Sequence, residues 1–115
     1  MENQNTENNA EKFDGANMYD QIIEAIKQVY DPEIPVNIFE LGLIYEVRID
    51  ETGKVDVTMT LTAPSCPAAG MLPGEVEEKV RTVAGVSDVS VEVTFDPPWD
   101  QSMMSEEAKL ELGFM

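Results

Sequence analysis

Three short segments of this sequence alternate between apolar and polar residues. They cover residues 43–50, 55–62 and 89–95. Because successive side chains of a strand point to opposite faces of a sheet, each segment predicts a β-strand with one apolar and one largely polar face. Glu51-Thr52-Gly53 joins the first two segments and predicts a hairpin. A sheet built this way needs a second layer over its apolar face.

Apolar residues at helical spacing predict a first helix over residues 18–30, before the first strand. Asn17 or Asp20 is available as its cap, and Asp31-Pro32 ends it. The segment that follows, residues 33–42, carries a proline and a glycine and predicts a structured loop with one helical turn around residues 37–41.

A second helix is predicted between the second and third strands, with an apolar stripe formed by Leu72, Val76, Val80 and Val83. Pro67 suits a helix start directly after Cys66, whereas Pro73-Gly74 indicates a later start. A short last helix over residues 105–112 begins with a capping signature at Ser105 and ends before Gly113.

The predicted fold class is therefore α+β, a compact two-layer domain with a three-stranded mixed sheet. Its element order is helix, strand, strand, helix, strand, helix. Residues 18–115 form this single domain, which is long enough for a real core. Residues 1–17 are rich in Asn and Glu with little to bury, and we interpret them as a flexible tail.

The charge of the chain excludes several classes of partner. Seven Lys and Arg residues against 23 Asp and Glu residues give a formal charge of −16, which repels nucleic-acid phosphates and anionic lipid. A single cysteine cannot form an internal disulfide, and the sequence shows neither a membrane span nor a signal peptide. We expect a cytoplasmic protein with no nucleic-acid or membrane partner.

That cysteine, Cys66, lies in the turn-rich run Thr62-Ala63-Pro64-Ser65-Cys66-Pro67. Backbone N–H groups near a helix start can stabilise a thiolate, which favours a reactive or metal-binding residue over a small buried side chain. If the third strand runs parallel to the second, segments 31–42, 62–67 and 96–99 meet at one end of the sheet. This convergence favours a functional thiol.

Several motifs in this order resemble the SufT/PaaD-like family of iron-sulfur cluster maturation factors. They are Asp31-Pro32-Glu33-Ile34-Pro35, Glu40-Leu41-Gly42-Leu43-Ile44-Tyr45, Leu61-Thr62-x-Pro64-x-Cys66-Pro67 and Pro97-x-Trp99 followed by Met103 and Leu112-Gly113. PaaD proteins carry a further cysteine-rich tail that is missing here, so the resemblance is to the SufT-like branch. It implies an accessory factor in cluster assembly or transfer, with Cys66 as the functional thiol.

The resemblance also makes Asp31 and Glu33 supporting site candidates, and it implies assembly scaffolds, carriers and client apoproteins as partners. Clusters are usually held by four thiolates, so a monomer with one cysteine and no histidine cannot hold one stably. A cluster would be transient, or bridged by Cys66 of each chain in a homodimer.

Thr62 and Trp99 are two further site candidates, and two alternative functions remain open. Thr62 can donate to a nearby thiolate, and Trp99 either packs the C-terminal segment or contacts a partner. A thiol enzyme or redox protein is one alternative function, although no histidine base and no second cysteine are present. An interaction module with an incidental thiol is the other. We expect a protein that is not an enzyme.

Overall fold

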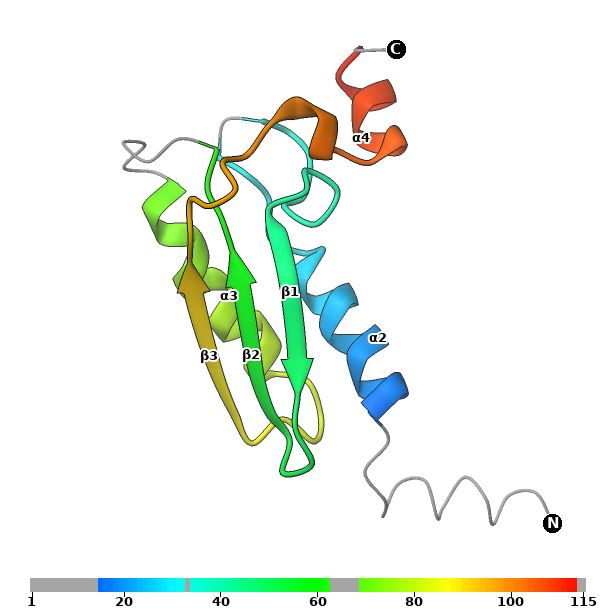
Figure 1. The fold of residues 1–115 in the computed structure, drawn as a ribbon. Coiled ribbons are helices and arrows are strands. Elements are labelled where there is room, and N and C mark those ends of the chain that lie inside the picture. Colours follow the sequence, from blue (N-terminus) through cyan, green and yellow to red (C-terminus); the bar gives the residue numbers. More distant parts are fainter. Residues whose placement is uncertain (1–14, 33, 63–68, 114–115) are drawn as a thin grey trace, which may run out of the picture.

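The computed structural model describes residues 15–32, 34–62 and 69–113 (Figure 1). Residues 1–14 of the predicted tail and the site candidates Glu33 and Cys66 lie outside the described residues. Residues 15–17, which were predicted as the end of the tail, belong to the first helix. Among the described helices, none combines the length and the apolar character that crossing a membrane requires.

The elements follow the predicted order. In sequence they are α2 (Gly15–Ile26), β1 (Ile44–Ile49), β2 (Lys54–Met59), the 3-10 turn η1 (Ala69–Met71), α3 (Leu72–Arg81), β3 (Asp88–Val93), the 3-10 turn η2 (Gln101–Met103) and α4 (Glu106–Glu111). β2 lies in the centre of the sheet, antiparallel to β1 and parallel to β3. The predicted α+β class and mixed three-stranded sheet are confirmed.

The sheet has one covered and one open face. α2 and α3 contact each other and lie on the same face, with α3 against β3 and α2 beside β1 (Figure 1). The core between the layers is apolar, and its fully buried members include Ile22, Ile26, Val55, Val57, Met59, Leu72, Val76 and Val80. The alternation of β2, in which Val55, Val57 and Met59 are buried, follows the pattern predicted from the sequence.

The first helix differs from the prediction at both ends. It begins at Gly15, three residues before the apolar stripe, so Asn17 and Asp20 lie inside the helix and neither is its cap. It ends at Ile26, because Val29 and Tyr30 pair with the next loop instead: the Val29 carbonyl accepts a hydrogen bond from the Ile38 N–H, and Tyr30 forms a bridge with Asn37.

The second helix takes the later of its two predicted starts. α3 begins at Leu72, and Pro73 lies in its first turn, where a missing N–H costs no helical hydrogen bond. The turn η1 precedes it from Ala69. A start directly after Cys66 is therefore wrong, and the α-helical N-terminus lies six residues beyond the cysteine in the sequence.

One end of the sheet gathers the long connections. Because β2 and β3 are parallel and β1 is antiparallel to β2, both β2 and β3 end where β1 begins. The segment before β1, the segment after β3 and the described residues that flank segment 63–68 all lie at this end (Figure 1). We call it the loop end of the sheet.

Candidate functional site

The loop before β1 is held by its own backbone hydrogen bonds. The Asp31 N–H donates to the Val36 carbonyl at 3.3 Å, and the Leu41 N–H donates to the Asn37 carbonyl at 3.1 Å. The second bond closes the single helical turn predicted around residues 37–41. The Asn37 side chain adds a hydrogen bond from the Glu40 N–H at 2.9 Å. This loop is thus an ordered wall of the loop end.

Asp31 is a buried carboxylate in this wall, with 6% of its surface exposed. Its Oδ1 accepts a hydrogen bond from the Ile34 N–H at 3.0 Å, which closes a turn across the Asp-Pro-Glu motif. One function of Asp31 is therefore to shape the loop. Glu33, two residues further on, lies outside the described residues.

The segment after β3 is fastened to this wall through Trp99 and Ser105. The indole Nε1 of Trp99 donates to the Leu41 carbonyl at 2.7 Å, and the Ser105 N–H donates to the Glu40 carbonyl at 2.8 Å. Trp99 is half-buried and packs against the core. The structure therefore uses Trp99 as the anchor of the C-terminal segment.

Tyr45 makes a second connection to the same segment. Its hydroxyl donates to the Pro97 carbonyl at 2.8 Å and lies 3.5 Å from the Met103 sulfur. Tyr45 occupies a bulge in β1, since Ile44 pairs with Met59 while Glu46 pairs with Thr58. Residues 45–49 keep the predicted alternation of half-buried and exposed side chains, whereas Ile44, predicted on the polar face, is half-buried next to Tyr45.

Two threonines, one buried and one half-buried, follow β2 in the sequence before segment 63–68. Thr60 is fully buried, and its N–H donates to the Leu43 carbonyl at 2.8 Å. Thr62 is half-buried and is the last described residue before segment 63–68. The predicted meeting of the segment before β1 with the segment after β3 is confirmed. Both lie at the end of the sheet from which β2 leads toward Cys66.

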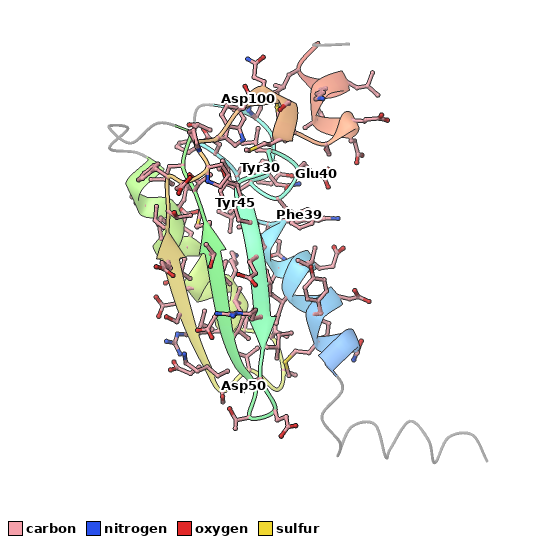
Figure 2. All side chains as sticks on the ribbon, in the orientation of Figure 1. Tyr30, Phe39, Glu40, Tyr45, Asp50 and Asp100 are labelled. Carbon is pink, nitrogen blue, oxygen red and sulfur yellow. The ribbon has the colours of Figure 1, made fainter. Side chains whose placement is uncertain are left out.

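A polar cleft of about 320 Å³ lies between α4 and the end of α2. Its lining includes Lys27, Tyr30, Asn37, Glu40, Glu107 and Glu111. The Lys27 ammonium lies 3.7 Å from a Glu40 carboxylate oxygen and 5.3 Å from the centre of the Phe39 ring. Figure 2 shows Tyr30, Phe39, Glu40 and Tyr45 together at the loop end, with Asp50 at the far end of the sheet.

The described residues offer no ready-made metal site. Across residues 15–32, 34–62 and 69–113, no three His, Cys, Asp or Glu side chains lie close enough together to hold a metal ion. The whole sequence has one cysteine and no histidine.

Sequence reasoning missed three participants in the loop end. Neither the Leu41 carbonyl nor the Tyr45 hydroxyl was predicted to hold the C-terminal segment, and Met103 was known only as a methionine of the motif. A tyrosine within an otherwise aliphatic row was the one available signal. Its hydroxyl needs a hydrogen-bond partner when the ring is partly buried.

Comparison with known proteins agrees with this architecture. Residues 19–93 match the family described as iron-sulfur cluster assembly protein. A crystal structure of a domain of unknown function from Bacillus anthracis superposes with a TM-score of 0.80 at 36% identity, covering 87% of this chain and 95% of that one.

Curated relatives of this chain are named as iron-sulfur protein maturation factors or as a cluster carrier. An Fe-S protein maturation auxiliary factor of Porphyromonas gingivalis is 54% identical over 84% of this chain and 91% of its own length. The maturation auxiliary factor SufT of Staphylococcus aureus is 38% identical over 74% of this chain and 97% of its own. An iron-sulfur cluster carrier protein of Synechocystis is 34% identical over 73% of this chain, which corresponds to 24% of that longer protein.

These matches confirm the SufT-like resemblance that the ordered motifs indicated. The family match covers residues 19–93, and the alignment with the Porphyromonas gingivalis relative is longer, at 96 residues. The chain belongs to the iron-sulfur cluster assembly protein family.

Proposed function

We propose that this protein is an accessory factor that helps transfer iron-sulfur clusters to client apoproteins, with Cys66 as the thiol that contacts the cargo. Relatives named as maturation factors and as a cluster carrier support this role. The same names belong to assembly factors rather than to catalysts, so the protein is not an enzyme. One cysteine without a disulfide partner agrees with action in the cytoplasm.

The observation that carries the proposal is the fastened loop end. Three hydrogen bonds, from Trp99 to Leu41, from Tyr45 to Pro97 and from Ser105 to Glu40, tie the segment after β3 to β1 and the loop before it. β2 ends at this same end of the sheet, and Cys66 follows β2 in the sequence. A hydrogen-bonded frame at this end suits a thiol that must meet a cluster on another protein.

Ligand count sets the form of the contact. Cys66 supplies one thiolate, whereas clusters usually need four. The remaining ligands would come from a partner protein, from small thiols or from the Cys66 of a second chain. We place Asp31, Glu33 and Thr62 as supporting residues of this contact, because Asp31 and Thr62 border the loop end and Glu33 follows Asp31 directly.

Anaerobic reconstitution with iron and sulfide tests the role of the thiol. We expect wild-type protein to bind at most one [2Fe-2S] cluster per two chains in the absence of added small thiols, and to pass it to an apo-ferredoxin. Cys66→Ser should abolish both. Absorbance, iron analysis and light scattering give the cluster type, its stoichiometry and the oligomeric state.

Asp56→Ser serves as the control, because it replaces a side chain on the open face of the sheet, away from the loop end. A stable cluster on each monomer, or equal transfer by Cys66→Ser and wild type, contradicts the proposed thiol. If wild type binds no iron but still speeds cluster transfer between a scaffold and the apo-ferredoxin in a Cys66-dependent way, the contact is made on the partner's cluster.

A further inference from the structure

Two large apolar side chains are exposed at the loop end of the sheet. Met71, the last residue of η1, is 66% exposed, and Phe95, two residues after β3, is 42% exposed. Both belong to the loop end, since η1 precedes α3 there and β3 ends there (Figure 1). Pro97 and Pro98, which follow Phe95, are exposed as well.

Phe95 follows β3 at a position that continues the alternation of the strand. Val89, Val91 and Val93 alternate toward the core, and the Thr94 N–H continues the parallel ladder by donating to the Met59 carbonyl at 2.8 Å. Continued by one step, this alternation assigns Phe95 to the same face as the three valines, at the loop end of the sheet. Met71 stands at that same end, directly before α3.

Charge around these two residues is negative. Glu75 is exposed in the first turn of α3, one helical turn after Met71, and the exposed Asp96 directly follows Phe95. The sequence has no Lys or Arg in residues 55–78 or in residues 82–108. The exposed apolar pair is thus bordered by carboxylates on a chain whose formal charge is −16.

We propose that Met71 and Phe95 form a docking patch for a client or carrier protein, which inserts apolar side chains flanked by Lys or Arg. This inference rests on the proposed function, because it supplies the contact that brings a partner's cluster site to the Cys66 segment. Charge complementarity selects the partner. A basic surface is attracted to the carboxylates that border the apolar pair, whereas a second copy of this chain brings the same negative charge.

Peptide binding tests the patch directly. The probe is a fluorescein-labelled peptide in which Leu-Phe-Leu is flanked on each side by two lysines, and the comparison probe carries glutamates instead. We expect the basic peptide to bind wild-type protein and the acidic peptide to bind at least about tenfold more weakly. Met71→Ser and Phe95→Ser together should weaken the basic peptide about tenfold, since central apolar side chains dominate small interfaces.

Matched controls come from exposed apolar residues elsewhere. Leu110 on α4 is 65% exposed and Tyr19 on α2 is 43% exposed, close to the values for Met71 and Phe95. Leu110→Ser with Tyr19→Ser should leave peptide binding unchanged. Equal weakening by both pairs of substitutions, or equal binding of both peptides, overturns the patch. Should Phe95→Ser fail to fold in a melting experiment, Met71→Ser alone still gives the answer.

Two further measurements separate this inference from the role of the thiol. Cys66→Ser should bind the basic peptide as wild type does, and the patch variant should keep the alkylation rate of Cys66 while losing transfer to apo-ferredoxin. If the peptide binds but no cluster transfer depends on Cys66, the docking patch is supported and the proposed role of the thiol is contradicted. A wild-type dimer that the patch variant converts to a monomer shows that a second copy occupies the patch and overturns the basic partner.

Discussion

The indole Nε1 of Trp99 donates a 2.7 Å hydrogen bond to the carbonyl oxygen of Leu41, 58 residues earlier in the chain. Tyr45 reinforces this link four residues after Leu41, through its hydroxyl bond to the Pro97 carbonyl. A strand and a loop are thereby joined to the C-terminal segment, which the sheet itself does not hold. These two side-chain hydrogen bonds act together with the backbone bond from the Ser105 N–H to the Glu40 carbonyl.

Trp99→Phe is expected to loosen the C-terminal segment without unfolding the domain. The substitution keeps most of the ring but removes the N–H donor, which costs about 1 kcal/mol of unfolding free energy. Hydrogen exchange should rise in residues 96–113 and stay unchanged in β2. Phe95→Leu, which removes a ring without an interior hydrogen bond, is the control. A rise in exchange spread evenly over the sheet contradicts the anchoring role.

Gly42→Ala is expected to destabilise the domain by about 2 kcal/mol, because an L residue is strained at a positive φ. Gly42 has φ of +86°, and an added Cβ there would collide with the Met103 carbonyl oxygen. Gly74 in α3 has nothing within 4 Å of an added Cβ, so Gly74→Ala should stabilise the helix by about 0.5–1 kcal/mol. Urea denaturation measures the free energy of unfolding of both variants. A destabilised Gly74→Ala together with an unchanged Gly42→Ala contradicts the roles given to the two glycines.

Cys66→Ser is expected to fold normally. The turn-rich sequence around Cys66 predicts a thiol that contributes little core volume. Substitutions away from the core usually change the free energy of unfolding by less than about 0.5 kcal/mol. The melting temperature should therefore shift by less than about 4 °C. Circular dichroism checks this, with Val57→Ala as a core control that should melt much earlier. A Cys66→Ser protein that melts as early as the control shows a mainly structural cysteine.

Asp50→Ala is expected to weaken the hairpin in a pH-dependent way. The Thr52 hydroxyl, and then the Lys54 N–H, donate to the Asp50 carboxylate and lower its pKa. A carboxylate with a depressed folded-state pKa stabilises the protein above the unfolded value of about 3.9, and this contribution is lost as pH falls through the lower folded value.

The melting difference between Asp50→Ala and wild type should accordingly be full at pH 7 and shrink below about pH 4. Glu51→Ala removes a neighbouring carboxylate from the same turn and controls for the change in net charge. A difference for Asp50→Ala that is independent of pH, or one matched by Glu51→Ala, contradicts the capping role of the Asp50 carboxylate.

Local pattern was enough to predict the elements of this fold. Alternation in residues 43–50, 55–62 and 89–95 located the strands, and helical spacing located α3 and α4. Ser105 was identified as a cap, and its hydroxyl accepts the Ala108 N–H at 3.1 Å. Such features depend on neighbours within one helical turn or on the period of a strand, so the sequence carries them directly.

The ends of the elements were harder to predict from the sequence than their existence. Val29 and Tyr30 continue the apolar spacing of α2, yet they pair with Ile38 and Asn37 after the helix has ended. Helical spacing cannot reveal this, because the competing hydrogen bonds come from a loop several residues later. The bulge at Tyr45 is hidden for the same reason, since it is set by pairing with β2.

For the candidate site, the sequence by itself identified the lone thiol, the ordered family motifs and the end of the sheet where the loops gather. These follow from residue chemistry and from strand direction. Only the tertiary structure decided what holds that end together, namely the hydrogen bonds from Trp99 to Leu41 and from Tyr45 to Pro97. It also decided that Met71 and Phe95 are left exposed there. Contacts between residues more than 50 positions apart depend on how the layers pack, and no local pattern encodes that distance.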